Sequence, residues 1–334
     1  MAFDTVPSSI DASANNPVTT GSLTPDAALP LVMTPAAGPV ALAPWLRDHA
    51  ASVGGLLEHH GGILFRGFGV DSPDAFEPVV RALSPTVLEY TERSTPRRRV
   101  KGNVYTSTEY PADQEIPPHN ENAYSHTWPR HIWFCCQQPA ATGGATPIVD
   151  SRRVWLDIHP SIRDRFIEKK VMYVRNYSRS VGLAWQEAFQ TDDRKAVEAY
   201  CATHAIEYEW RDRDRLRTQQ VRQAVTMHPV TGESLWFNQA HLFHVSSLPR
   251  EVGRSLLAVF KDERDLPRHA LYGTGEAIEF DALDHIRSVY TRLAVTFAWQ
   301  QGDVLLLDNM LTAHGRLSFT GPRRVLVSMA TPFA

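Results

Sequence analysis

The sequence has few cysteines, little net charge and no long uninterrupted apolar run. Its three cysteines, Cys135, Cys136 and Cys201, form no CxxC pair and are too few for a disulfide framework, which predicts reduced, buried thiols in a cytoplasmic protein. The net charge of −3 gives no general reason to expect a nucleic acid or a membrane surface as partner. No glycine-rich phosphate loop opens a βαβ unit, so a dinucleotide-binding sheet is not expected.

The N-terminal part also lacks features that a targeting segment needs. Residues 1–46 contain no Lys or Arg, which argues against a secretory signal or a transit peptide. Prolines at positions 30, 35, 39 and 44 interrupt the apolar stretch that follows, so a membrane-spanning helix is not expected there. Residues 1–28 are rich in Ser, Thr, Asn, Ala and Pro, and this composition predicts a disordered tail.

The rest of the chain has the composition and patterning of a folded, mainly β protein. Of its 334 residues, 43% are hydrophobic, which is enough for a sizeable core. The pattern predicts helices over residues 43–61 and 72–83, and short strands over 62–70, 105–149 and the C-terminal third. Residues 151–223 are more charged and predict a helical insertion or lid. We therefore expect one domain over residues 29–334, a β-barrel or sandwich framed by helices.

A histidine and a carboxylate stand two residues apart in "IPPHNENAY". On a strand, His119 and Glu121 would share one face and could bind the same metal ion. His314 is the best candidate for a third ligand, because it follows the apolar run "GDVLLLDNMLTAHG" and Gly315 allows close backbone approach. Two histidines and one carboxylate are typical of non-haem Fe(II) oxygenases. Each motif alone is also compatible with an ordinary polar turn or a structural histidine.

Two further features predict an anion next to this metal. Arg324 lies in the apolar strand "RRVLVSM", where a guanidinium is costly to bury without a carboxylate partner. Thr146 in "GGATP" offers a hydroxyl group at the start of another strand.

Taken together and in this order, five segments resemble the TauD/TfdA (taurine dioxygenase-like) family of Fe(II)- and 2-oxoglutarate-dependent oxygenases. The segments are "HNE", "GGATPIVDSRRV", "WFNQAHLFHV", "WQQGDVLLLDN" and "AHGRLSFTGPRRVLV". The likeness runs from about Gly61 to the C-terminus and is closest to the branch that oxidises amino acids in natural-product pathways. It implies a double-stranded β-helix, or jelly-roll, core with Fe(II) bound by His119, Glu121 and His314.

The resemblance also implies how 2-oxoglutarate binds. Its distal carboxylate would contact Thr146 and Arg324, with Arg323 as the alternative arginine. Arg324 is preferred because it is the second arginine of the pair and would share a strand face with Leu326 and Ser328. Family members often carry a basic residue at the position of Ser328, so a sulfonate substrate is in doubt.

The metal-binding carboxylate indicates the type of reaction. Related halogenases replace it with a small residue, so Glu121 favours hydroxylation with O₂ as cosubstrate. The implied substrate is an amino acid or a derivative of one, either free or bound to an acyl or peptidyl carrier protein. Desaturation or cyclisation at the same iron stays open. Two rivals from other classes are a zinc-dependent hydrolase with the same three ligands and a catalytically silent jelly-roll binding module.

Substrate contacts are less well defined by the sequence. The candidates flank the metal motif or lie in other polar segments: Asn122, Tyr105, Thr108, Arg175 and Asn238. The basic segment 93–102, "RSTPRRRVKG", is a candidate docking site for an acidic carrier protein. His241 and His244 are expected to be structural or to reach the pocket edge.

Overall fold

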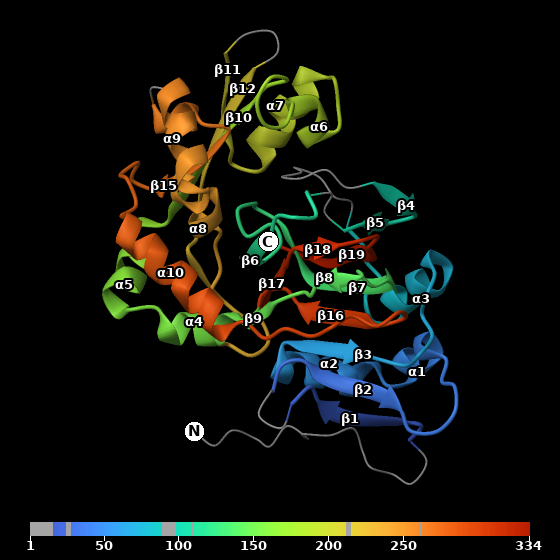
Figure 1. The fold of residues 1–334 in the computed structure, drawn as a ribbon. Coiled ribbons are helices and arrows are strands. Elements are labelled where there is room, and N and C mark those ends of the chain that lie inside the picture. The colour runs from blue at the N-terminus through green and yellow to red at the C-terminus, as the bar shows by residue number, and fades with distance from the viewer. Residues whose placement is uncertain (1–15, 25–27, 89–97, 108–109, 212–214, 261) are drawn as a thin grey trace.

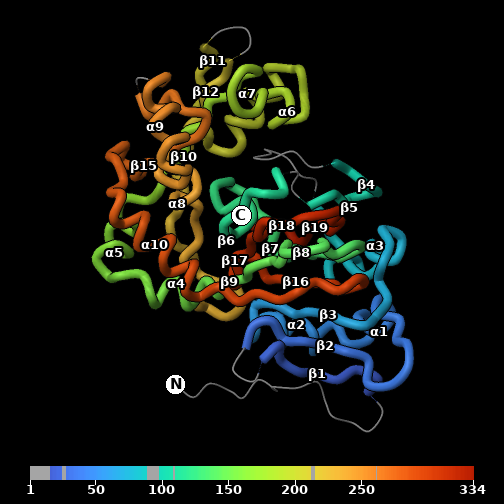
Figure 2. The backbone as a smooth tube through the Cα atoms, viewed as in Figure 1, coloured from blue at the N-terminus to red at the C-terminus, as the bar shows by residue number. Residues whose placement is uncertain are grey.

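The computed structural model describes residues 16–24, 28–88, 98–107, 110–211, 215–260 and 262–334. Its largest sheet has eight strands (Figure 1). In spatial order they are β1 (Val18–Ser22), β2 (Leu31–Pro35), β3 (Gly62–Phe65), β16 (Val304–Asp308), β7 (Trp128–Gln138), β19 (Arg324–Phe333), β5 (Val104–Thr106) and β4 (Arg99–Lys101). Figure 2 shows the red C-terminal segments running between blue and green ones. Strand β16 lies between β3 and β7, and β19 lies between β7 and β5, so distant parts of the chain complete this sheet together.

A smaller sheet faces the large one. It consists of β6 (Ile116–His119), β17 (Thr312–Arg316) and β9 (Ile148–Asp150), with a short pair formed by β8 (Thr142–Gly143) and β18 (Phe319–Thr320) nearby. Apolar side chains fill the space between the sheets, among them Phe134, Ile148 and Val327. The ring of Phe134 on β7 lies 5.1 Å from the ring of His314 on β17. The two layers confirm the predicted mainly β, jelly-roll core.

Three N-terminal helices cover the outer face of the large sheet. They are α1 (Leu42–Asp48), α2 (Ala50–His60) and α3 (Pro73–Leu83) (Figure 1). The apolar sides of these helices pack against strand residues such as Ile63, Leu306 and Leu326. The helix predicted over residues 43–61 is divided into two, and it ends as expected at Gly61, which has a φ of 77°. Ser72 caps α3, because its side chain accepts a hydrogen bond from the Ala75 amide at 3.2 Å.

A second lobe packs beside the jelly roll. Its four-stranded sheet has the order β11 (Glu207–Trp210), β12 (Leu216–Arg222), β10 (Val171–Tyr177) and β15 (Arg268–Tyr272). The accompanying helices are α4 (Ser151–Asp157), α5 (Pro160–Lys169), α6 (Trp185–Phe189), α7 (Arg194–Thr203), α8 (Ala240–Phe243), α9 (Arg250–Val259) and α10 (Phe280–Leu293). A hairpin of β13 (Val225–Met227) and β14 (Ser234–Trp236), and the short 3₁₀ helices η1 (Val245–Ser247) and η2 (Glu263–Asp265), complete it.

The sequence predicted a helical insertion over residues 151–223, but this region also contains strands. Within it, β10 and β12 pair over seven residues each, and β15 from outside the range joins β10 on the other side. Buried and more exposed side chains alternate along β12, which is a strand pattern. Its charged residues concealed this pattern, because Arg217 and Arg222 are held by hydrogen bonds inside the lobe.

Part of the segment predicted to be a disordered tail, residues 1–28, is a strand. Residues 18–22 form β1, which pairs antiparallel with β2 at the edge of the large sheet. The β-branched residues Val18, Thr19 and Thr20 favour this extended conformation, and Val18 contributes to the core. Residues 1–15 and 25–27 lie outside the described residues.

Candidate metal centre

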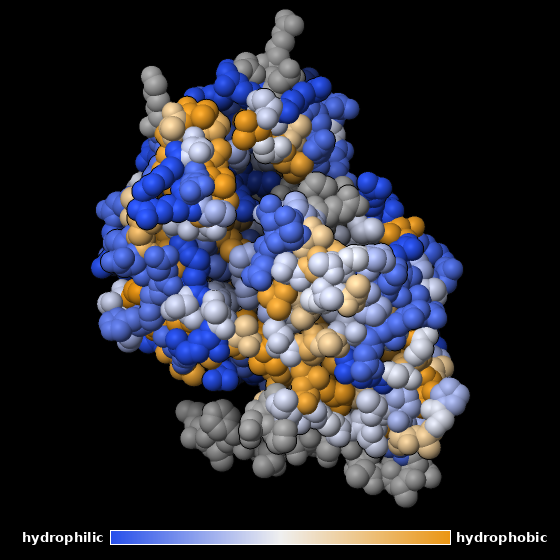
Figure 3. Space-filling view, in the orientation of Figure 1, coloured by the Kyte–Doolittle hydropathy of each residue, from blue (hydrophilic) through white to orange (hydrophobic). Residues whose placement is uncertain are grey.

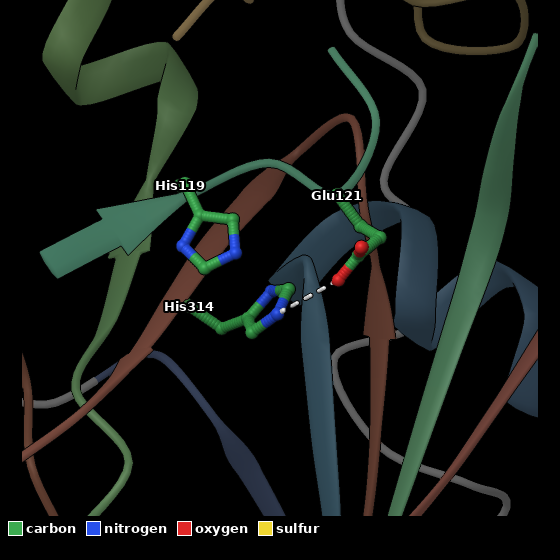
Figure 4. A group of neighbouring side chains, drawn as sticks. All are labelled: His119, Glu121 and His314. Atoms are coloured by element: carbon green, nitrogen blue, oxygen red, sulfur yellow. Dashed lines mark ion pairs between the residues drawn. The ribbon is translucent and has the colours of Figure 1, made fainter. Parts of the chain in front are cut away.

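The structure brings His119, Glu121 and His314 together between the two sheets. His119 ends β6, and His314 lies directly opposite it on the antiparallel strand β17. The two imidazole rings are 4.8 Å apart, and His314 Nε2 lies 3.8 Å from a carboxylate oxygen of Glu121 (Figure 4). One ligand atom from each residue lies within 4.8 Å of the others. Two imidazoles and a carboxylate form a donor set suited to Fe(II).

The convergence of His119 and Glu121 does not arise from strand alternation. Strand β6 ends at His119, and Glu121 lies in the turn that follows. The turn places the Glu121 side chain next to the two histidines, where it is only 3% exposed. The expected proximity is present, but a turn rather than one strand face produces it.

Gly315 allows the two ligand-bearing strands to approach closely. A Cβ atom at this position would lie 2.4 Å from the Ile116 carbonyl oxygen and 3.0 Å from the Pro118 nitrogen. Any larger residue would therefore push β17 away from β6. The close approach inferred from the sequence is present, and it keeps His314 opposite His119.

Hydrogen bonds orient the His119 ring. Its Nδ1 lies 2.9 Å from the Pro117 carbonyl oxygen, and because a carbonyl can only accept, Nδ1 carries the proton. This tautomer places the ring lone pair on Nε2, which is the atom that could bind a metal ion. His241 supports the same loop, since its Nε2 donates to the Pro118 carbonyl at 3.2 Å. Burial lowers the pKa of His241 to about 3, so its role here is that of a neutral hydrogen-bond donor.

Asn309, which the sequence reading did not single out, holds the backbone of Glu121. Its side-chain oxygen accepts from the Glu121 amide at 2.6 Å, and its side-chain nitrogen donates to the Glu121 carbonyl at 3.0 Å. The same nitrogen donates to the Pro129 carbonyl at 2.8 Å. The side chain of Asn120 donates to the Asn309 carbonyl at 2.7 Å. The sequence feature that could have identified Asn309 is its position as a polar residue directly after the buried strand β16.

A narrow pocket next to the two histidines contains Thr146 and two arginines. Its walls include Phe134, His119, His314, Thr146, Arg316, Arg323, Val325 and Val327. The Thr146 hydroxyl accepts a hydrogen bond from Trp299 Nε1 at 3.0 Å, so its own proton remains available for an anion. Arg323 donates through Nε to the Gly144 carbonyl at 3.1 Å. This arrangement would suit the distal carboxylate of 2-oxoglutarate.

Arg323, and not the preferred Arg324, lies on the wall of this pocket. Strand β19 has a register shift between Arg324 and Val325, and Arg323 shares the pocket face with Val325 and Val327. Leu326 packs against the N-terminal helices on the other face, and Arg324 is exposed. The alternative arginine, Arg323, therefore lies on the pocket wall. The strand face that Arg324 was expected to share with Leu326 and Ser328 is turned away from the pocket.

The pocket is strongly positive. Burial and then the charge of Arg316 lower the pKa of Arg323 to about 10, which still leaves it charged at neutral pH. Burial also lowers the pKa of Arg316, whose guanidinium donates to the carbonyls of Tyr110, Pro111 and Gln114. Two neighbouring guanidinium groups favour a ligand that carries negative charge, as 2-oxoglutarate does.

A larger cavity of about 630 Å³ opens on the other side of His119. His119 and Ile116 line both cavities, so the metal centre lies between them. Glu121, Tyr110, Tyr124, Gln239, Phe243 and Arg268 contribute to the walls of the larger one. In the space-filling view the surface is hollowed between the lobe that carries α6, α7 and α9 and the part that carries β6 (Figure 3). The volume of the larger cavity suits a small organic substrate.

The predicted substrate residues mostly have other surroundings. Asn122 adopts a left-handed conformation in the turn after the metal motif, and Tyr105 packs in the core between the sheets. Asn238 donates to the Ala224 carbonyl and accepts from the Ala240 amide, which is a structural role. Arg175 is buried above the rings of Tyr124 and Tyr177. Thr108 lies outside the described residues, as do residues 93–97 of the basic segment 93–102. None of the four described candidates is among the residues that line the larger cavity, whereas Gln239, Tyr110 and Arg268 are.

Two facing β-sheets with a converging pair of histidines and a carboxylate define a jelly-roll oxygenase of the non-haem iron class. Residues 29–330 match the model of the taurine catabolism dioxygenase TauD, TfdA family. The chain is 44% identical over 277 residues to the dapdiamide synthesis protein DdaC of Enterobacter agglomerans, covering 83% of this chain and 84% of that protein. The chain belongs to the TauD/TfdA family.

Solved structures agree with this fold. PvcB of Pseudomonas aeruginosa, an Fe, alpha-ketoglutarate dependent oxygenase from an isonitrile synthetic pathway, matches with a TM-score of 0.56 and 15% identity over 95% of this chain and 92% of that one. An asparagine oxygenase, solved with Fe(II), 3-hydroxyasparagine and succinate, matches with a TM-score of 0.51 and 15% identity over 87% and 79%. Similarity at this level shows the fold alone.

Family membership gives the protein its enzyme class. It is a non-haem Fe(II)- and 2-oxoglutarate-dependent dioxygenase, with O₂ as the other cosubstrate. This excludes the zinc hydrolase and the silent binding module that the sequence alone left open. Within the described part of the chain, every helix is too short or too polar to cross a membrane.

Proposed function

We propose that this enzyme hydroxylates an unactivated C–H bond of an amino acid or an amino-acid derivative. The convergence of His119, Glu121 and His314 at the boundary of two cavities carries the proposal. One cavity has the charge that 2-oxoglutarate needs, and the other has room for an organic substrate. The relatives support the substrate class through their names, which include dapdiamide synthesis and asparagine oxygenase.

Each residue of the centre has a defined task in this proposal. His119, Glu121 and His314 bind Fe(II), which when bound supplies the O₂ chemistry of C–H oxidation. Arg323 and Thr146 hold the distal carboxylate of 2-oxoglutarate and so orient its other end toward the metal. The overall reaction converts substrate, O₂ and 2-oxoglutarate into alcohol, succinate and CO₂, with one oxygen atom entering the alcohol and one entering succinate. Phe134 and Val327 keep the narrow pocket apolar around these groups.

The first experiment is an anaerobic titration of the protein with Fe(II) and 2-oxoglutarate. A visible metal-to-ligand charge-transfer band is expected for the wild type and should be lost in His119→Ala. His59→Ala is the matched control, because His59 is exposed on α2. A band of equal strength in His119→Ala, or tight zinc binding without any band, would contradict the proposed centre.

The second experiment identifies the substrate and the outcome of the reaction. Amino acids are supplied free or as thioesters on a carrier protein, and succinate release is measured together with the product mass. Hydroxylation adds one oxygen atom, whereas desaturation or cyclisation removes two hydrogen atoms. Succinate release coupled to neither class of substrate would contradict the proposed substrate class.

A further inference from the structure

Arg268 is a charged residue in the larger cavity to which the metal chemistry gives no task. It is the first residue of β15, and its side chain is exposed and lines the cavity together with His119 and Glu121. The guanidinium lies 5.6 Å from the centre of the Phe243 ring. Among the described residues it has no hydrogen-bond acceptor and no carboxylate partner, although Glu115 also lines the cavity. A cation without a partner in a cavity marks a place for an anionic ligand.

A second arginine strengthens the positive potential at this place. Arg175 on β10 is the register partner of Arg268 on β15, so the two residues are direct neighbours across the sheet. Arg175 is buried against the rings of Tyr124 and Tyr177, at 5.7 Å and 4.8 Å, and is held within the lobe. The side chain is open to the cavity, but the surrounding protein removes water from the guanidinium and so lowers the pKa of Arg268. The Arg175 charge lowers this pKa further, against the opposing effect of Tyr110. An anion that enters the cavity would relieve both effects.

The surroundings of Arg268 favour a carboxylate over a larger anion. Phe243 lies beside its guanidinium, and Leu242, Leu248 and Val252 are further apolar residues on the wall of the same cavity. One accessible planar guanidinium beside apolar side chains matches a single carboxylate on a hydrocarbon-bearing molecule, because its two N–H groups can bind both oxygens. Gln239 and Tyr124 line the same cavity and offer polar groups to the rest of such a molecule.

We propose that Arg268, with Arg175 behind it, binds the carboxylate of the substrate. This inference rests on the proposed function and narrows it: the substrate is an amino acid or derivative whose carboxyl group is free, not one held as a carrier thioester. The second lobe thereby contributes a substrate anchor through β15, while the jelly roll contributes the metal and cosubstrate sites.

The test uses ligand pairs that differ only at the carboxyl group, namely L-amino acids and N-acyl amino acids compared with their carboxamides. Each is titrated anaerobically into the enzyme loaded with Fe(II) and 2-oxoglutarate, and binding is read from the change in the charge-transfer band. The best-bound acid is expected to bind at least about tenfold more tightly than its amide. Arg268→Gln should remove this preference, Arg268→Lys should retain part of it, and neither should change the affinity for 2-oxoglutarate.

Arg250→Gln is the matched control, because Arg250 is an exposed arginine at the start of α9. It should keep the full preference for the acid. A preference that survives in Arg268→Gln would overturn the proposal. The proposal would also be overturned if no acid in the panel bound more tightly than its amide. A carrier thioester that binds more tightly than the free acid, with an affinity unchanged in Arg268→Gln, would overturn it as well.

A missing band in the wild type would instead refute the proposed function, and a second readout separates the two hypotheses. The same acid and amide pairs are titrated calorimetrically into the metal-free protein and into its Arg268→Gln and Arg323→Gln variants. A carboxylate preference that depends on Arg268 and not on Arg323 supports the anchor without any metal. If the carboxylate preference is absent, or depends on Arg323 alone, the proposal that Arg268 binds the substrate carboxylate is overturned.

Discussion

At the scale of single residues, strand alternation decides which of two neighbouring arginines faces the pocket beside the two histidines. Arg323, Val325 and Val327 share the pocket face, and the register shift between Arg324 and Val325 leaves this alternation along β19 intact. The sequence shows that Arg324 alternates with Leu326, but not which face of the strand is turned toward the pocket. Leu326 packs against the N-terminal helices, so that face is the opposite one.

The two arginines therefore give a direct comparison. Arg323→Ala is expected to raise the dissociation constant for 2-oxoglutarate by about tenfold to a hundredfold, because it removes a partly buried charge-assisted contact. Arg324→Ala should leave it within about twofold, since Arg324 is exposed. Anaerobic titration followed through the charge-transfer band measures both variants. The opposite order would reinstate Arg324 as the anchor.

Asn309 gives a second prediction at this scale. Asn309→Ala would leave the Glu121 amide, the Glu121 carbonyl and the Pro129 carbonyl without their present partner. Buried groups that lose a partner cost about 1–3 kcal/mol each before relaxation, so a clear loss of stability is expected. Affinity for Fe(II) should fall by about tenfold to a hundredfold, because Glu121 is no longer held in place. Chemical denaturation and Fe(II) titration check the two effects, and unchanged Fe(II) affinity would limit Asn309 to a structural role.

At the scale of secondary-structure elements, the site depends on the close contact of β6 and β17. The sequence predicted that His119, Glu121 and His314 lie close together and that Gly315 allows close backbone approach. The reason given for His119 and Glu121, a shared strand face, was wrong, because a turn places Glu121. The sequence did not allow Arg268 to be predicted, since "RHALY" reads as an ordinary strand and the cavity is formed by other elements around it. The second lobe was missed as a sheet for a related reason. Its strands carry arginines whose partners lie elsewhere in the chain.

Gly315→Ala tests the contact between the two strands. The added Cβ would meet backbone atoms of Ile116 and Pro118, which cannot move without displacing β6. A loss of about 1–3 kcal/mol in the free energy of unfolding is expected, together with weaker Fe(II) binding. Gly54→Ala is the control, because Gly54 lies within α2 with open space around it and alanine favours helices. Thermal melting and Fe(II) titration would show whether Gly315→Ala behaves like this control, which would contradict the steric argument.

At the scale of the whole molecule, buried histidines make the fold sensitive to acid. Burial lowers the pKa of His131 and His269 to about 4, and that of His244 to about 3, whereas an unfolded histidine titrates near 6.5. Below pH 6.5 the unfolded chain therefore binds more protons than the folded one, and the free energy of unfolding falls until the folded-state pKa values are reached.

We expect the free energy of unfolding to change little between pH 7.5 and pH 8.5 and to fall steadily from about pH 6.5 to pH 4. Each of these histidines adds up to about 1.4 kcal/mol per pH unit to the slope. Urea denaturation at a series of pH values measures it. His131→Gln should reduce the slope in this range, and a slope equal to that of the wild type would show that His131 is not a neutral buried group.

The position of β16 and β17 late in the chain has a consequence for synthesis. Glu121 and its partner Asn309 are separated by 188 residues, and β16 fills the gap between β3 and β7, which were made much earlier. Until the last strands leave the ribosome, β3 and β7 have exposed apolar edges and the metal site lacks His314. A nascent or truncated chain that ends before Val304 would therefore expose unpaired strand edges and tend to self-associate. The yield of folded enzyme then depends on how quickly the C-terminal segment is synthesised, or on a chaperone that protects those edges until it is.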